Sequence, residues 1–453
     1  MKLALEIRLA AADEDNPALG VSISGTGGLT LEATYNTPPA TPTDLYADYL
    51  SCERTPEKAS YLGDPSPTLV AKLSDADPGD VLLTGDFAIW PADHPDQRFE
   101  FRQHYLLNGR FGGGPVPERL ADGVTYGWQV RADDGTDTSA WSKTCCFTVD
   151  VTQPAAPVVA SSNYPPNVLN PGGVPVDFTF TPNGSTDVIG YQFSWNNGGG
   201  NVIVWGHGPD GTPIPPNPFA DTQTTVKAKR NGTVTVSLIP PPTGFDTIYV
   251  QSIDHAFNTS PITQYAFYFA DTAPTITPLS TSQFDTPVTL KLAPNPAVGK
   301  VLSYTVEDNG GTPQTIAAGT GGTATVTVTL NAIYGNDITV ASNSANGWVS
   351  SDADFRQYFD TTPTVTSADY PEGATSGGVG IPGTFNFAES IPHTASFTYQ
   401  FDGEPAVTIP AATDGTAQVT WAPTFSGFHV LNVYGTTADG INMQPYYFIF
   451  FVN

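Results

Sequence analysis

The stretch Phe147-Thr148-Val149-Asp150-Val151-Thr152-Gln153-Pro154 is the first copy of a short joint that recurs along this chain. Related joints are Phe269-Ala270-Asp271-Thr272-Ala273-Pro274 and Phe359-Asp360-Thr361-Thr362-Pro363. Each copy ends an apolar, alternating run, which is typical of the last strand of a domain. Its proline fixes φ, lacks a backbone donor and favours an extended residue before it. The pattern therefore predicts β-domains that are connected by short, stiff linkers.

Length and composition support the same interpretation. The chain has 453 residues, which fits four domains of roughly 100 residues each. The hydrophobic fraction is 39% and the aromatic fraction 11%, whereas charged residues make up only 13%. This mixture favours strands and turns over long helices, and no long run has a 3.6-residue apolar period. We predict an all-β chain of tandem immunoglobulin-like or fibronectin III-like β-sandwiches, preceded by a small N-terminal β-segment.

The joints and composition changes divide the chain into five parts. The predicted parts are an N-terminal β docking segment at 1–36 and domains at 43–152, 155–271, 272–360 and 361–453.

The N-terminal segment has an apolar stripe with a period of two. Leu3, Leu5, Ile7 and Leu9 alternate with Lys2, Ala4, Glu6 and Arg8, a pattern typical of a strand with one buried face. A lone edge strand leaves backbone donors and acceptors unpaired, and strand addition to a partner would satisfy them. We therefore predict that this segment docks the chain onto an assembly. The alternative is that its strands complete the first sandwich.

Several motifs in the first domain resemble known families. The run Leu120–Ala132, with Tyr126 near its strand start, resembles the penultimate strand of fibronectin type III-like domains. The run Pro67–Asp75, Phe87–Trp90, Trp141-Ser142 and Cys145–Asp150 resemble immunoglobulin-like repeats of large actinobacterial surface proteins and of phages that infect such hosts. This resemblance implies a fold and a setting, and it specifies no activity.

The second and fourth domains look like copies of one another. Asn163-Tyr164-Pro165 matches Asp369-Tyr370-Pro371, Tyr191-Gln192-Phe193 matches Tyr399-Gln400-Phe401, and Gly244-Phe245 matches Gly427-Phe428. Matches in one order indicate an internal repeat. We predict that the two domains superpose strand for strand with Tyr191 and Tyr399 equivalent. The third domain is expected to keep only the late part of the pattern.

The chain has three cysteines, Cys52, Cys145 and Cys146. Cys145 shares its strand parity with Phe147 and Val149, the expected core side. The resembling surface repeats often carry a cysteine near the start and in the last strand of a domain, which implies a disulfide between Cys52 and Cys145. Three free thiols are the alternative, because the redox compartment is unknown.

No catalytic motif is visible. The sequence contains no HExxH, no GxSxG and no P-loop. Asp254-His255 matches a strand-end turn of the fourth domain and is interpreted as a turn. We predict that the protein is not an enzyme and uses no cofactor.

Two kinds of binding site are considered. Asp75, Asp77 and Asp80, and separately Asp133, Asp134 and Asp137, could supply oxygen ligands for calcium, but neither run has EF-hand spacing. Solvated turns are the commoner explanation, and no metal site is predicted. Trp205, Trp348 and Trp421 lie near loops or strand ends and are candidates for stacking on sugar rings. Core packing or a loop anchor is the alternative for them.

Charge and the N-terminus suggest a setting. The net charge is −27, with 17 basic and 44 acidic residues, so nucleic acid and anionic lipid are not expected partners. No segment is apolar enough to span a bilayer, and the N-terminus does not resemble a secretory signal. A protein that is made in the host cytoplasm needs no secretory signal if it leaves the cell as part of a particle.

We therefore predict a non-enzymatic structural protein of a phage virion, a minor tail or tail-tip component that is oligomeric within its assembly. Its partners would be other tail proteins, bound through the N-terminal segment, and host-envelope glycans. The alternative is a bacterial cell-surface adhesin or carbohydrate-binding module.

Overall fold

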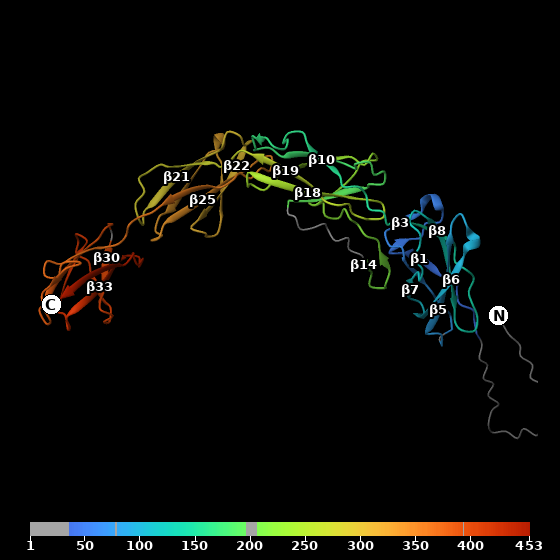
Figure 1. The fold of residues 1–453 in the computed structure, drawn as a ribbon, viewed down its shortest axis with the longest axis horizontal. Coiled ribbons are helices and arrows are strands. Elements are labelled where there is room, and N and C mark those ends of the chain that lie inside the picture. The colour runs from blue at the N-terminus through green and yellow to red at the C-terminus, as the bar shows by residue number, and fades with distance from the viewer. Residues whose placement is uncertain (1–35, 78, 196–205, 393) are drawn as a thin grey trace, which may run out of the picture. The chain divides into compact units, whose positions relative to one another are not determined.

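The computed structural model describes residues 36–77, 79–195, 206–392 and 394–453. Its regular structure is almost entirely strand, with 3-10 turns of three residues each at Pro56–Lys58, Pro95–Gln97 and Thr320–Gly322. The prediction of an all-β chain is confirmed. Within the described ranges, no helix has the length and apolar character needed to cross a membrane. The described residues form two compact units, one that ends at 150 and includes 206–216, and one that begins at 151 and includes 217–453. Strands of both units are labelled in Figure 1.

The first unit contains one sandwich of two sheets. Its strands are β1 (Thr43–Ala47), β2 (Leu50–Ser51), β3 (Ser60–Leu62), β4 (Thr68–Lys72), β5 (Leu82–Pro91), β6 (Phe99–Leu107), β7 (Phe111–Pro115), β8 (Thr125–Asp133) and β9 (Cys145–Val149). The sheet orders are β2-β1-β4-β7 and β3-β9-β8-β5-β6. Alternate residues of β8, such as Trp128 and Val130, are buried, as a period of two predicts. The Tyr126 hydroxyl accepts a hydrogen bond from the Ala121 N–H at 3.0 Å, so this tyrosine closes a corner as the fibronectin resemblance implies.

A small hairpin from a distant part of the sequence belongs to the first unit. It consists of β14 (Gly206–His207) and β15 (Pro213–Ile214). The His207 ring lies 4.9 Å from the ring of Tyr49. The sequence had placed these residues in the second domain, because a contact between segments far apart in the chain leaves no local signal.

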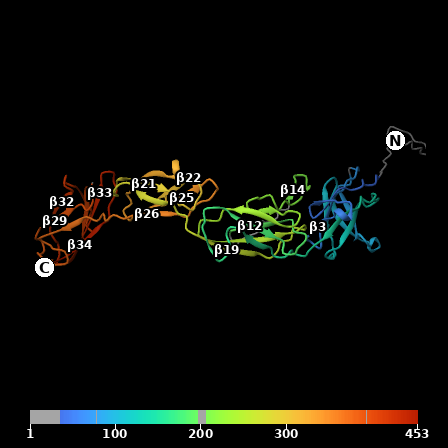
Figure 2. The same ribbon diagram turned by 90° about the horizontal axis from the view of Figure 1, so that it is seen from above.

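The second unit begins with a sandwich of three and five strands, whose β12 and β19 are labelled in Figure 2. One sheet contains β10 (Val158–Ser161), β12 (Val176–Thr181) and β17 (Val234–Leu238). The other has the order β11 (Leu169–Asn170), β19 (Thr263–Phe269), β18 (Phe245–Ile253), β13 (Gly190–Ser194) and β16 (Thr225–Lys227). The core between them is rich in aromatic rings, including those of Tyr164, Phe178 and Phe267.

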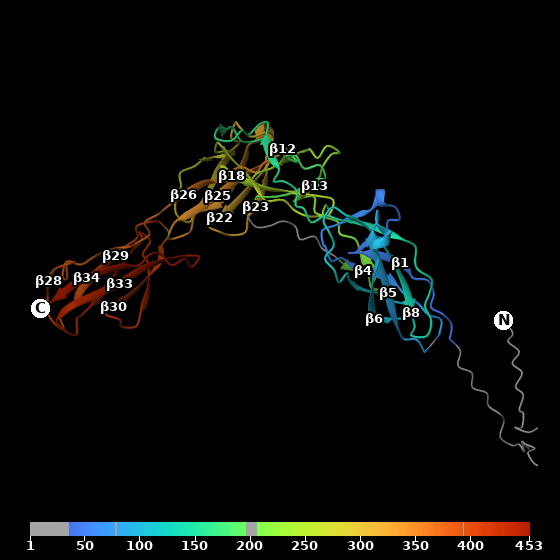
Figure 3. The same ribbon diagram turned by 45° about the vertical axis from the view of Figure 1, so that its right-hand side comes forward.

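Two further sandwiches follow in the second unit. The third pairs β20 (Thr275–Pro278), β21 (Pro287–Ala293) and β24 (Ala324–Thr329) with the sheet β23 (Gln314–Ala317), β22 (Val301–Asp308), β25 (Asn336–Ser344) and β26 (Ala353–Gln357). The fourth pairs β27 (Thr364–Thr366), β29 (Gly383–Ala388) and β32 (Thr416–Trp421) with β28 (Thr375–Ser376), β34 (Tyr446–Val452), β33 (Gly427–Thr437), β30 (Thr394–Phe401) and β31 (Val407–Pro410). Strands of both sheets of the fourth sandwich are labelled in Figure 3.

The strand order of the second and fourth sandwiches is the same, but the predicted equivalence of Tyr191 and Tyr399 is wrong by two residues. Phe193 lies opposite Val250, and Tyr399 lies opposite Val433, the counterpart of Val250 in the repeat. The counterpart of Tyr399 is therefore Phe193. A shift of two residues keeps every side chain on its own face of the sheet, so the apolar pattern alone could not reveal the error.

The third domain is a complete sandwich, which corrects the expectation that it keeps only the late part of the repeat. Its early strand β22 carries Tyr304, whose hydroxyl donates to the Gly322 carbonyl at 2.6 Å. Tyr191 in the second sandwich makes the same bond to the Gly232 carbonyl, also at 2.6 Å. The shared contact marks the two tyrosines as counterparts although the surrounding sequences differ.

The joints within the second unit are closed by a buried threonine. Thr272 and Thr361 have no exposed surface. The Thr272 hydroxyl accepts a hydrogen bond from the Ser351 N–H at 3.4 Å, and the Thr361 hydroxyl accepts one from the Gln444 N–H at 3.0 Å. Each donor lies in the last hairpin connection of the following sandwich. The recurring Asp-Thr pair of the joints thus has a packing role.

Candidate functional site

The predicted docking stripe Leu3, Leu5, Ile7 and Leu9 lies outside the described residues, and so does Trp205. Their roles stay predictions.

The structure joins Cys52 to Cys145 in a disulfide with a Cα–Cα distance of 5.2 Å. This bond ties the segment after β2 to β9. Cys146 is a buried free cysteine. Burial, followed by the nearby charge of Glu57, raises the pKa of the Cys146 thiol, so it is a poor nucleophile at neutral pH.

The tryptophans of the second unit anchor packing. Trp348 is 1% exposed and its indole N–H donates to the Thr272 hydroxyl at 3.1 Å. The prediction of a glycan contact is wrong for Trp348, because its ring is enclosed at the joint between the second and third sandwiches. Trp421 is partly buried and stacks on Phe401 with ring centroids 4.3 Å apart. The alternative of a loop anchor accounts for both residues.

Aromatic and arginine side chains stack on the outer face of the first sandwich. The Arg98 guanidinium lies 5.0 Å from the Trp90 ring and 4.3 Å from the Trp141 ring. Arg131 covers Trp141 at 4.7 Å and pairs with Asp86 at 3.0 Å. These contacts are cation–π interactions and an ion pair, so the arginines brace β5, β6 and β8 from outside.

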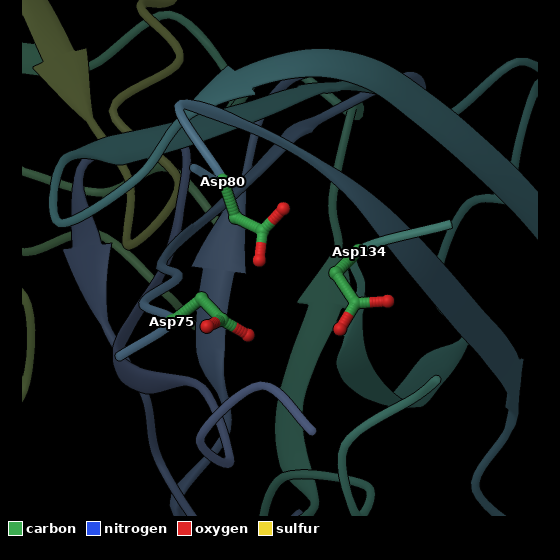
Figure 4. Close-up of side chains that lie close together, drawn as sticks. All are labelled: Asp75, Asp80 and Asp134. Carbon is green, nitrogen blue, oxygen red and sulfur yellow. The ribbon is translucent and has the colours of Figure 1, made fainter. Parts of the chain in front are cut away.

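The two acidic runs that the sequence presented separately meet in the first sandwich. Asp75 follows β4, Asp80 precedes β5, and Asp134 follows β8. One carboxylate oxygen from each lies within 4.8 Å of the others, and Figure 4 shows the three side chains around one space. Both runs lie at the same end of the sandwich because β4 and β8 end there.

Neighbouring polar groups hold this acidic cluster in place. The Asn108 amide donates to the carbonyls of Asp75 and Asp80 at 3.1 and 2.8 Å. The Asn36 amide donates to the carboxylates of Asp134 and Asp137, both at 3.0 Å. Asp75 Oδ2 is buried and has no hydrogen-bond partner among the described residues. The loops therefore present their carboxylates in a defined arrangement.

The carboxylates differ in their electrostatics. Burial, and then the charges of Asp75, Asp134 and Asp77, raises the pKa of Asp80. Burial alone would also raise the pKa of Asp134, but hydrogen bonds from the backbone of Asp137 and Thr136 and from Asn36 bring it below its ordinary value. Three carboxylates around one space are the hard oxygen ligands that Ca²⁺ prefers. When no cation is bound, the three negative charges repel one another.

Asp80→Asn is expected to raise the thermal midpoint of the first sandwich at pH 7 in metal-free buffer. A raised pKa in the folded state means stability that is present at low pH and lost as pH rises through that pKa. The charged Asp80 side chain thus destabilises the unmodified chain at pH 7, and the variant is free of this cost. The difference in thermal midpoint between variant and unmodified chain should therefore disappear towards pH 3, where Asp80 is protonated. Near-ultraviolet circular dichroism between pH 3 and 7 measures this, with the exposed Glu118→Gln as control.

A lower midpoint for Asp80→Asn in metal-free buffer at pH 7 would contradict the repulsion argument. The same comparison with millimolar CaCl₂ tests the cation chemistry, because bound Ca²⁺ would stabilise the unmodified chain and not the variant.

The comparisons with known proteins add little to this description. No family model matches the chain, and no curated protein matches it. Among solved structures, the FN1–FN3 domains of chicken CNTN1 match at 12% identity and a TM-score of 0.18, over 71% of this chain and 100% of that one. The fibronectin(III)-like modules of Clostridium thermocellum CbhA match at 14% identity and a TM-score of 0.17, over 40% and 94%. Such low scores carry no argument about function. The sheet orders confirm the predicted fold class, a tandem array of immunoglobulin-like or fibronectin III-like β-sandwiches.

Proposed function

We propose that this chain is a non-enzymatic structural protein of a phage virion, a minor tail or tail-tip component whose β-sandwiches contact the host surface. The observation that supports it best is the tandem array with closed joints, in which Thr272 and Thr361 are buried between consecutive sandwiches. Short joints of this kind suit a spacer that presents domains at set intervals along a chain.

The buried histidine of the fourth sandwich supports a structural role. His429 Nδ1 lies 2.6 Å from Asp402 Oδ2, which in atoms alone matches an acid–base pair. The imidazole is 0% exposed and stacks on Phe425 and Phe450, and its Nε2 lies 3.1 Å from the Phe425 carbonyl. Since no substrate reaches an enclosed ring, this pair serves packing.

A cell-surface adhesin or carbohydrate-binding module is the second candidate. The disulfide between Cys52 and Cys145 is compatible with it, because disulfides persist in oxidising surroundings such as the cell exterior. An exposed virion protein meets the same surroundings after release, so the disulfide fits both candidates.

The two candidates are separated by locating the protein. Antibodies raised against the purified chain are applied to density-purified phage particles and to washed cell envelopes of the producing strain. We expect the protein in particles at a constant ratio to the major tail protein. Its presence in envelopes and absence from particles would overturn the virion proposal in favour of the adhesin.

Deleting residues 2–35 is expected to leave the sandwiches folded and to abolish incorporation into particles. The apolar stripe at Leu3, Leu5, Ile7 and Leu9 would supply the buried side chains of strand addition, at about 1.5–3 kcal/mol each before the costs of binding. Copy number per purified particle is measured by quantitative mass spectrometry. Incorporation at the normal copy number would remove the docking role.

A further inference from the structure

A pocket in the second sandwich is lined by the strongest cationic group of this acidic chain. Lys227, Lys229 and Arg230 stand within four residues, in a protein with 17 lysines and arginines and a net charge of −27. All three side chains are exposed and line a pocket of about 580 Å³ together with His255. None of them takes part in an ion pair among those found for the described residues. The pocket therefore presents three cationic groups that are not held in ion pairs, while Asp187 and Asp254 stand next in sequence to its lining residues Val188 and His255.

The fold does not require these charges, as the sister sandwiches show. The Lys229 N–H donates to the Thr233 carbonyl, and its counterparts Gly319 and Ala412 donate in the same way to Thr323 and Thr416. At the positions of Lys227, Lys229 and Arg230 the third sandwich has Ala317, Gly319 and Thr320, and the fourth has Pro410, Ala412 and Thr413. The same hairpin thus forms without any cation, and the third sandwich has an uncharged hairpin wall in a similar pocket.

Several other lining residues of the pocket are apolar. Phe219 and Phe257 line it with Ile189, and the Lys227 ammonium lies 5.6 Å from the Phe219 ring centroid. Phe257 has a φ of 66°, a left-handed conformation that the equivalent turns of the third and fourth sandwiches reach with Gly347 and Gly440 at 87° and 92°. The turn itself therefore requires this conformation, and a partly exposed phenylalanine at the pocket is what distinguishes the second sandwich. Aromatic faces pack against the C–H groups of sugar rings, and the cations meet an acidic substituent on such a ring.

We propose that this pocket binds an acidic saccharide, a sugar unit that carries a phosphate or carboxylate group. Lys229 and Arg230 pair with the anionic group of the saccharide, and Phe219 and Phe257 contact its sugar ring. A volume of about 580 Å³ lies within the usual range of small-ligand sites. Nucleic acid is disfavoured because an extended polyanion would meet the negative charge of the rest of the chain. The site is independent of whether the chain is carried on a virion or on a cell.

The test uses the full chain, three dextrans that differ in their substituents, and a nucleic acid as a second polyanion. Phosphorylated dextran, carboxymethyl dextran, plain dextran and oligothymidylate are immobilised, and binding is measured by interferometry at 150 mM NaCl. At this salt concentration distant charges are screened beyond about 8 Å. We expect at least tenfold tighter binding to one acidic dextran than to plain dextran.

The variant Lys229→Ala with Arg230→Thr installs the residues of the fourth sandwich and should weaken that binding at least tenfold. Lys58→Ala with Lys291→Ala removes the same charge from exposed positions in other sandwiches and should change it less than twofold. Equal binding to all dextrans, or equal losses in both variants, would overturn the proposal. The proposal would also be overturned if oligothymidylate bound as tightly as the acidic dextran and lost this binding in the variant of Lys229 and Arg230. The ligand would then be a nucleic acid.

Discussion

Replacing Cys52 and Cys145 with alanine is expected to lower the free energy of unfolding of the first sandwich by about 4.6 kcal/mol, by the chain-entropy model. The disulfide spans 93 residues of sequence, so its loss returns a large amount of freedom to the unfolded chain. Hydrogen exchange of peptides from β8, read by mass spectrometry, reports this sandwich separately from the others. The β8 amides should exchange faster by the factor that corresponds to this free energy.

Cys146→Ala is the matched control, because Cys146 is buried next to the disulfide and forms no cross-link. The Cys146→Ala substitution should lower the free energy of unfolding by about 0.5–3 kcal/mol, the range common to single substitutions. This decrease should be the same with and without a reductant. Dithiothreitol should destabilise the unmodified chain and leave the double variant unchanged. Equal exchange rates for the double variant and the control would show that the cross-link contributes nothing to stability.

Trp348→Ala is expected to cost about 3–5 kcal/mol, the usual range for removing a buried tryptophan, and to destabilise two sandwiches at once. The ring belongs to the third sandwich, yet it packs into the core of the second, 5.3 Å from the Phe269 ring. Its indole N–H also bonds to Thr272 in the joint. Exchange should therefore accelerate in both β19 and β25, and proteolysis at the joint should become faster.

Trp348→Phe separates ring packing from the hydrogen bond. It keeps an aromatic ring at the joint and removes the donor to Thr272, so it should cost clearly less than Trp348→Ala. Thr272→Val removes the acceptor instead and leaves the ring in place. If Trp348→Ala accelerated exchange in β25 alone, the joint would not couple the two sandwiches, and the role assigned to Trp348 would be wrong.

The Asp80 variant and the acidic-saccharide pocket address different sandwiches, so their outcomes are independent. Asp80 concerns the charge of the first sandwich, and Lys229 with Arg230 concerns the second. Substitutions that share no interaction partner normally contribute additively to stability. A chain that carries both sets of substitutions should therefore show both effects unchanged.

Local patterns in the sequence determined the fold class, the joints and the strand faces. The alternation around Trp128 marked its strand, and the acidic residue and proline after Phe269 and Phe359 marked the domain ends. These features are readable because the side-chain period of a strand and the restrictions of proline act between neighbouring residues. The pairing of Cys52 with Cys145 was predicted from their positions near the start and in the last strand of the first domain, with support from the resemblance to a family.

Features that depend on contacts through space were decided by the tertiary structure. The two-residue offset between Tyr191 and Tyr399 leaves every side chain on its expected face, so only strand pairing reveals it. Trp348 lies at a strand end in the sequence, and the neighbouring sandwich encloses it. Lys229 and Arg230 are neighbours in the sequence, but their pocket needs Phe219 and Phe257 from other connections. Such sites form between segments that the chain brings together only on folding, and for that reason no local pattern contains them.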